Sequence, residues 1–167
     1  SPMSRGLGDV YKRQVYVQLG AGRINDIGSE IRLTVEALLV HEDVTVVVGE
    51  SMLGQRIEMD LERVVLLRDY PNSMYFNAFD ATVQAGGYNS FHETRRFRLP
   101  ALFYPNMNTG MDDQFARCEA SQDEGWGLVL VERNEQTICE GIDRLLSLSR
   151  PEVQNPTING ALELLSL

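Results

Sequence analysis

Residues 44–48 read Val-Thr-Val-Val-Val, a run of β-branched and almost entirely apolar residues. Such a run is typical of a strand that is covered on both faces of a parallel sheet. Other short apolar segments recur along the chain, and segments with helical spacing of apolar residues lie between them. The alternation predicts an α/β domain with a parallel sheet and helices on both faces. The expected strands are residues 15–19, 44–48, 63–67, 80–85, 101–104 and 128–131.

The bulk composition limits the classes of function. A chain of 167 residues is long enough for one domain with a sizeable core. The formal net charge of −9 argues against a nucleic-acid partner. No apolar run is long enough to cross a bilayer. Cys118 and Cys139 lack metal-binding or redox spacing, so we expect reduced thiols and a cytoplasmic protein.

The two ends of the chain differ from its middle. Residues 1–14, SPMSRGLGDVYKRQ, resemble the in-frame translation of a transposon adapter used in sequencing libraries, and the alternative is a genuine polar leader. We therefore expect a non-native leader followed by a domain over residues 15–150. Residues 151–167 read as a truncated connector and short helix. On this interpretation the chain is a fragment of a longer gene whose N-terminal domain is missing.

Polar groups follow the expected strand 80–85. The glycine pair Gly86-Gly87 lets the backbone approach a ligand closely, and the helix after it begins with free N–H groups that suit a diphosphate. Ser90 could add a hydroxyl donor, and Glu93 could accept hydrogen bonds from vicinal ribose hydroxyls. The alternative is an ordinary helix start with Ser90 and Glu93 as a capping box.

Three other polar segments follow expected strands. Asp112-Asp113-Gln114 opens a helix, where acidic residues either complement the helix dipole or bind sugar hydroxyls. Arg68-Asp69 ends a strand at the edge where a base could bind, or forms a surface turn. Gly20-Ala21-Gly22 does not complete a dinucleotide-binding fingerprint, because Asn25 stands in place of the third glycine. Gly20 and Gly22 are better explained as making room for a phosphate or an acceptor.

Taken in order, these residues resemble the C-terminal, Rossmann-like half of a GT-B glycosyltransferase. The resemblance is greatest to the family 28 group, which includes the N-acetylglucosaminyltransferase of peptidoglycan synthesis. It is carried by Asp80, residues 86–93, Leu99-Pro100, Pro105 and residues 112–117.

The resemblance implies a role for each matching position. Gly87, Asn89 and Ser90 would surround the donor diphosphate, and Glu93 would hold the ribose. The remaining assignments are Asp113 and Gln114 to the donor sugar, Arg68 and Asp69 beside the base, and His92, Gly20 and Gly22 as weaker donor-site candidates.

The resemblance also implies a reaction. A hexose or N-acetylhexosamine would pass from a UDP-sugar to a hydroxyl acceptor, with no cofactor or bound metal, because the helix dipole and donor groups stabilise the leaving diphosphate. The catalytic base would belong to the missing N-terminal domain, so this fragment alone should be inactive. Peripheral association of the full-length protein with the inner face of the membrane is compatible with this family. The alternatives are the nucleotide-binding subunit of a split transferase, a nucleotide-sugar 2-epimerase fragment, and a Rossmann-like domain without a sugar-nucleotide site.

Overall fold

The computed structural model describes residues 12–20, 27–50, 57–108, 110 and 112–150. Within these ranges lie six strands, four α-helices and one 3-10 helix. The strands are β1 (Arg13–Gln18), β2 (Val44–Gly49), β3 (Val64–Leu67), β4 (Ala81–Ala85), β5 (Ala101–Tyr104) and β6 (Gly127–Val129). The helices are α1 (Ile27–Leu39), η1 (Asn72–Ala78), α2 (Tyr88–Arg96), α3 (Gln114–Asp123) and α4 (Glu135–Ser147).

The six strands form one sheet with the order β3-β2-β1-β4-β5-β6, and every pairing is parallel. β2 and β3 therefore extend the sheet on one side of β1, and β4, β5 and β6 extend it on the other side. The predicted parallel α/β architecture is confirmed. β1 begins two residues earlier than expected, and within it the Arg13 side chain pairs with Asp43 at 2.7 Å.

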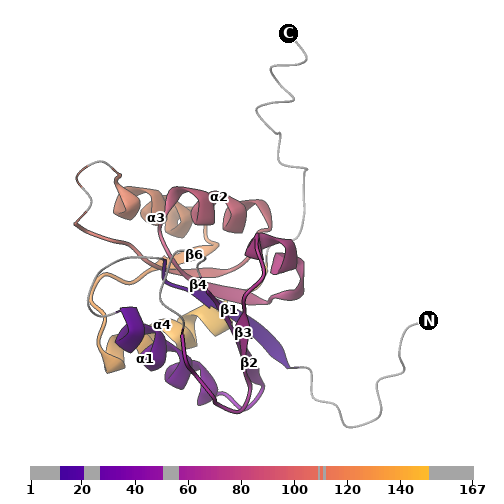
Figure 1. Ribbon diagram of the computed structural model, residues 1–167. Coiled ribbons are helices and arrows are strands. Elements are labelled where there is room, and N and C mark those ends of the chain that lie inside the picture. Colours follow the sequence, from indigo (N-terminus) through magenta and orange to yellow (C-terminus); the bar gives the residue numbers. More distant parts are fainter. Residues whose placement is uncertain (1–11, 21–26, 51–56, 109, 111, 151–167) are drawn as a thin grey trace.

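Helices cover both faces of the sheet (Figure 1), with α1 and α4 on one side and α2, α3 and η1 on the other. The alternation of side chains along β1 shows why both faces need cover. Val15 and Val17 pack into the aliphatic core under α1 and α4, whereas Tyr16 packs with Phe76 and Phe79 on the opposite face. Period-two alternation in a strand that is buried on both sides produces this arrangement.

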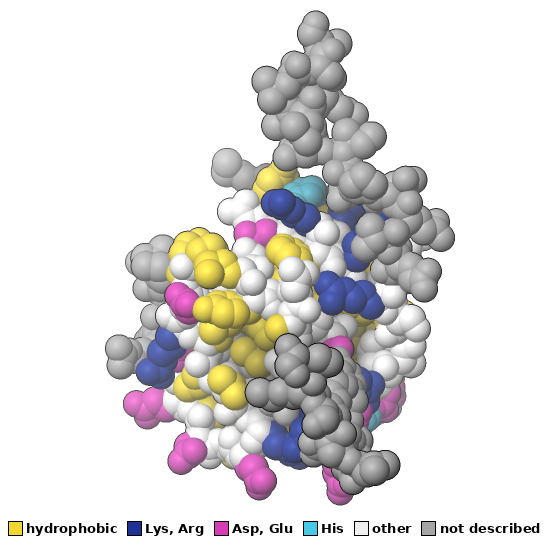
Figure 2. All heavy atoms as spheres, turned by 90° about the vertical axis from the view of Figure 1, so that its right-hand side faces the viewer, with side chains coloured by type: hydrophobic (Ala, Val, Ile, Leu, Met, Phe, Trp, Pro, Cys, Tyr) yellow, Lys and Arg dark blue, Asp and Glu magenta, His cyan; other side chains and the backbone are white. Residues whose placement is uncertain are grey.

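The edge strand β3 carries part of the exposed apolar surface. Val65 is 53% exposed and Met74, in the neighbouring η1, is 62% exposed. Figure 2 shows hydrophobic side chains gathered on the face that is turned to the right in Figure 1. Among the described residues, no helix combines the length and the apolar character needed to span a membrane.

Candidate functional site

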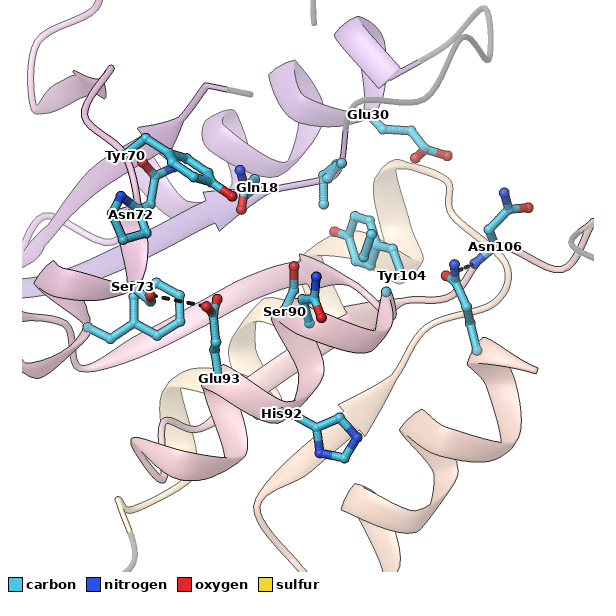
Figure 3. Close-up of a pocket in the computed structure, with 18 of the residues that line it drawn as sticks. Gln18, Glu30, Tyr70, Asn72, Ser73, Ser90, His92, Glu93, Tyr104 and Asn106 are labelled. Carbon is cyan, nitrogen blue, oxygen red and sulfur yellow. Dashed lines mark hydrogen bonds between the residues drawn. The ribbon is translucent and has the colours of Figure 1, made fainter. Parts of the chain in front are cut away.

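A cleft of about 880 Å³ opens at the carboxyl edge of the sheet. Its walls come from the segments that follow β1, β3, β4, β5 and β6, so distant parts of the sequence meet there. The main polar and aromatic lining residues are Gln18, Glu30, Tyr70, Asn72, Ser73, Asn89, Ser90, Glu93, Tyr104, Asn106, Gln114 and Arg133. Figure 3 shows Gln18, Tyr70, Ser90, Glu93 and Tyr104 arranged around the same space.

The position of the cleft follows from the strand order. β1 and β4 are neighbours, but the chain leaves β1 toward one edge of the sheet and leaves β4 toward the other. The two connections diverge and leave a crevice outside the carboxyl ends of these strands, where ligands bind in open α/β sheets. Gly20 from the end of β1 and Gly87 from the end of β4 both line it. Gly20 adopts a φ of 88°, a conformation that glycine reaches without strain.

The turn between β4 and α2 presents backbone donors to the cleft. Gly87 is the N-cap of α2 and has no side chain that could cap the helix. The first amide groups of the helix therefore stand at its positive end, facing the cleft that Gly87, Asn89 and Ser90 line. The capping-box alternative is wrong, because Ser90 lies in the first turn of α2 rather than before it.

The Glu93 carboxylate lies one turn further along α2 and points toward η1 (Figure 3). Its Oε1 accepts a hydrogen bond from the Ser73 hydroxyl at 3.2 Å. Both residues line the cleft and are half-buried. This contact, rather than one with Ser90, fixes the position of the carboxylate.

Polar residues at the start of α3 have two different roles: one caps the helix and another lines the cleft. Asp113 is the N-cap of α3, and its Oδ1 accepts a hydrogen bond from the Ala116 amide at 2.9 Å. Gln114 lines the cleft, and its Oε1 accepts from the Asn106 amide at 3.0 Å. Asp112 pairs with Arg117. Of the two residues predicted at the sugar, the structure thus brings Gln114 into the cleft and gives Asp113 a capping role.

The turn after β3 places Tyr70 in the wall of the cleft, whereas Arg68 and Asp69 are not lining residues. Arg68 pairs with Glu50 at 2.8 Å, and Asp69 accepts a hydrogen bond from the Tyr75 hydroxyl. Their side chains are engaged on the protein surface.

His92 and Gly22 complete the set of predicted positions. His92 lines the outer part of the cleft, but its exposed ring projects away from Glu93 (Figure 3) and contacts the ring of Tyr88, with the centroids 4.4 Å apart. Gly22 lies outside the described residues.

Tyr104 and Arg133 also line the cleft, although the sequence did not indicate either of them. Tyr104 is almost fully buried, and its hydroxyl is 2.9 Å from that of Thr34. Burial is the main reason that the pKa of Tyr104 rises to about 12. Arg133 follows β6, pairs with Glu30 at 2.8 Å and stands 5.6 Å from the centre of the Tyr104 ring. Arg133 thereby joins the loops after β5 and β6 to α1.

Asn72 is another residue that the sequence did not indicate. It lines the cleft, although only 6% of its surface is exposed. Its amide nitrogen donates to the Tyr16 hydroxyl at 2.8 Å, and its Oδ1 has no hydrogen-bond partner among the described residues. Buried polar atoms without a partner are few in folded proteins, and each calls for an explanation such as a bound water molecule or a functional role.

A metal centre is not formed by the described residues, which contain no group of three or more His, Cys, Asp or Glu side chains placed to hold an ion. The polar groups of the cleft are instead backbone amides, side-chain amides, hydroxyls, two carboxylates, the His92 imidazole and the Arg133 guanidinium. These groups suit a ligand with phosphate and hydroxyl groups.

No protein-family model and no curated protein match the chain. Solved structures do match in fold. The glycosyltransferase of kitacinnamycin matches with a TM-score of 0.67 and 18% identity, over 82% of this chain and 35% of that one. The spinosyn rhamnosyltransferase SpnG in complex with thymidine diphosphate matches with a TM-score of 0.66 and 17% identity, over 82% of this chain and 38% of that one.

A third solved structure, the glycosyltransferase VinC in complex with dTDP, matches with a TM-score of 0.60 and 19% identity, over 81% of this chain and 34% of that one. The chain thus spans little more than a third of the length of these proteins. At these identities the likeness establishes the fold, which is that of the C-terminal half of a GT-B glycosyltransferase.

Proposed function

We propose that this chain is the donor-binding part of a glycosyltransferase, which holds a nucleoside-diphosphate sugar in the cleft at the carboxyl edge of its sheet. One observation carries the proposal. The N-terminus of α2, which follows Gly86-Gly87 and has no side-chain cap, lies at the same cleft as the Glu93 carboxylate. The cleft therefore holds both a helix N-terminus that can bind a diphosphate and a carboxylate that can accept a hydrogen bond from a pentose hydroxyl. The fold around it is one that glycosyltransferases share.

The diphosphate is assigned to the N-terminus of α2. The backbone amides there donate hydrogen bonds, and the helix dipole favours negative charge. Asn89 and Ser90 add side-chain donors on the first turn. As the bond to the sugar breaks, negative charge grows on the diphosphate, and donors that are already in place stabilise it without rearranging.

The nucleoside is assigned to the space between Glu93 and the turn after β3. Glu93 would accept a hydrogen bond from the pentose, and Tyr70 and Asn72 would bound the base. The Tyr70 side chain is 69% exposed, so its ring is accessible to a base. The unpartnered Oδ1 of Asn72 supports this assignment, since a small rotation of the amide would let it accept from the ligand.

The sugar is assigned to the side of the cleft near α3. Gln114 lines this region, and its amide nitrogen is a donor that a sugar hydroxyl could use. Oδ1 of Asp113 accepts the hydrogen bond that caps α3, so Oδ2 would make any contact with the sugar.

The reaction that fits these assignments is displacement at the anomeric carbon. An acceptor hydroxyl attacks the sugar, the bond to the diphosphate breaks, and the nucleoside diphosphate leaves. The acceptor and the general base belong to a second domain or partner chain that faces this cleft. Two of the solved structures with this fold hold thymidine diphosphate. The narrower likeness to family 28, and with it uridine as the base, rests on the sequence motifs alone.

Calorimetric titration of the 167-residue chain with UDP and with TDP tests the proposal. We expect binding in the millimolar range or tighter for at least one nucleotide, and a loss of about tenfold in Glu93→Ala, because a charge-assisted hydrogen bond is removed. Glu140→Ala, in the exposed face of α4, is the matched control and should leave binding unchanged. No binding of either nucleotide at millimolar concentration, or equal binding by Glu93→Ala, would contradict the proposal.

A further inference from the structure

We infer that Arg117 is a positioning residue for the proposed diphosphate site, although it does not itself line the cleft. Its guanidinium holds the carbonyl of Gly86, and this contact turns the following amide, that of Gly87, toward the cleft. The inference rests on the proposed function, in which the start of α2 binds a diphosphate. It adds a residue of α3 that acts on the ligand through the backbone rather than by touching it.

The place of Arg117 in its own helix calls for a tertiary explanation. Arg117 is the fourth residue of α3, close to the end of the helix where the dipole favours negative groups. Its side chain is 17% exposed, so the guanidinium lies against the protein instead of extending into solvent. Local helix preference therefore does not account for an arginine at this position.

Three contacts of the Arg117 guanidinium supply that explanation. Nη1 donates to the Gly86 carbonyl at 2.7 Å, and Nη1 and Nη2 both donate to the Asp112 carboxylate. The guanidinium carbon also lies 5.3 Å from the centre of the Tyr88 ring. Gly86 and Tyr88 flank Gly87, the N-cap of α2, and the other partner precedes α3. One side chain therefore holds the starts of both helices together.

The contact with Gly86 also sets the direction of the next amide. The bond between Gly86 and Gly87 is trans, and a planar trans peptide points its C=O and its N–H in opposite directions. Arg117 takes the carbonyl on the side of α3, so the N–H of Gly87 points the other way, to the cleft that Gly87 lines. This amide has no hydrogen-bond partner among the described residues, so a phosphate oxygen can accept from it.

A peptide between two glycines needs such a restraint. Without β-carbons on either side, its plane can rotate with little steric resistance. An added β-carbon at Gly87 would meet no atom within 4 Å, so packing around Gly87 does not fix the peptide. A donor that is oriented before the ligand arrives saves the cost of ordering it on binding. The same orientation suits the reaction, in which negative charge grows on the leaving diphosphate.

The backbone amide signal of Gly87 reports on this role. In the wild-type chain, TDP should move the Gly87 amide proton downfield, as a new hydrogen bond to phosphate does. In Arg117→Met this shift should largely disappear at saturating TDP, while the amide of Tyr70 still responds. Calorimetric titration of the same variant should show TDP binding about tenfold weaker, because a preorganised hydrogen bond to a charged group is lost.

Arg95→Met is the matched control. Arg95 pairs with Glu124 at 2.8 Å and so joins the opposite ends of α2 and α3, and its loss changes the net charge by the same amount. This variant should keep both the TDP affinity and the Gly87 shift of the wild type. Circular dichroism and the urea midpoint of each variant check that the fold is retained.

Two results would overturn the inference while leaving the proposed function intact. One needs no variant: TDP shifts the amides of Ser90 and Tyr70 in the wild-type chain but leaves that of Gly87 unchanged. The other is a folded Arg117→Met chain that keeps the wild-type Gly87 shift at saturating TDP, whatever its affinity. If no amide of the cleft responds to millimolar TDP, the proposed function fails, and the inference fails with it.

Discussion

Gly86 lies directly against the thiol of Cys118. A β-carbon added at position 86 would overlap the Sγ of Cys118 and come within 3.3 Å of the β-carbon of Gln114. Cys118 is fully buried, so it has no space into which it could withdraw. The absence of a side chain at position 86 therefore lets the starts of α2 and α3 lie side by side at the edge of the cleft.

The two glycines of this turn should respond differently to alanine. Gly86→Ala should lower the free energy of unfolding by about 1–3 kcal/mol, because the added methyl group overpacks the contact with Cys118. A β-carbon at Gly87 meets no atom within 4 Å, so Gly87→Ala should change stability by about 0.5 kcal/mol at most. Urea denaturation of both variants measures the difference.

Although Gly87→Ala should hardly affect stability, it should weaken nucleotide binding. Gly87 lines the cleft, and a methyl group there would occupy space beside the helix start that we assign to the diphosphate. We expect weaker binding of TDP in a variant of unchanged stability. Equal stability losses in the two alanine variants would contradict the packing role of Gly86.

The cap of α3 gives a second prediction. Asp113 accepts a hydrogen bond from the Ala116 amide, so Asp113→Ala should lower the free energy of unfolding by about 1 kcal/mol. Asp113→Asn retains an acceptor of the same shape and should keep most of the wild-type stability. Thermal denaturation of the two variants provides the comparison, and an equal loss in both would show that the charge of Asp113, rather than its cap hydrogen bond, stabilises the helix.

The sequence predicted the fold well because its signals were local. Runs such as Val44–Val48 and the helical spacing of Ile138, Ile142 and Leu145 specify elements without reference to the rest of the chain. The parallel arrangement followed from their alternation. The start of β1 was misplaced by two residues because the polar pair Arg13-Gln14 gives no strand signal. Arg13 is held there by Asp43, which is 30 residues away.

The candidate site could be predicted only in part. Ser90 and Glu93 fit the spacing of a capping box, and only the position of the helix start, at Tyr88, shows that they do not form one. Tyr104 was expected only as the last residue of a strand, because nothing in the sequence pairs it with Thr34, 70 positions away. Arg133 follows a strand, and the rule that ligands bind at the carboxyl ends of strands would have indicated it. Nothing in the sequence indicates Ser73, because its contact with Glu93 depends on the tertiary fold.

Acid stability should depend on the pair formed by Asp112 and Arg117. The Arg117 guanidinium, which also donates to the Gly86 carbonyl at 2.7 Å, holds the pKa of Asp112 below its usual value. A carboxyl group whose pKa is lowered by folding adds stability above about pH 4, and this contribution is lost as the pH falls through the folded-state pKa. Arg117→Met should therefore lose less stability on acidification than the wild type.

The measurement is the urea midpoint, compared between neutral pH and about pH 3 for each protein. Arg144→Met, which removes an exposed arginine from α4, is the matched control and should follow the wild type. If Arg117→Met and the wild type lost the same stability over this range, the ion pair would not be a source of acid sensitivity.

Alkaline stability should depend on Tyr104. Burial raises the pKa of Tyr104 to about 12, above the value of about 10 for an unfolded tyrosine. Its contribution is complete below about pH 10 and is lost as the pH rises toward 12. Tyr104→Phe should reduce this loss of stability at high pH. At neutral pH the same substitution should lower the free energy of unfolding by about 1–2 kcal/mol, because the buried Thr34 hydroxyl loses its partner. Denaturation at pH 7 and at about pH 11 gives both values.

The proposed function requires that the cleft between the ends of β1 and β4 bind a nucleoside diphosphate. Backbone amide chemical shifts, mapped as TDP is added to the isotope-labelled chain, test this residue by residue. The largest changes should fall at Gly87, Asn89 and Ser90, with further changes at Gly20 and Tyr70, and Glu93→Ala should weaken all of them together. Saturating changes confined to another part of the surface, or no changes at millimolar TDP, would show that the cleft is not the nucleotide site.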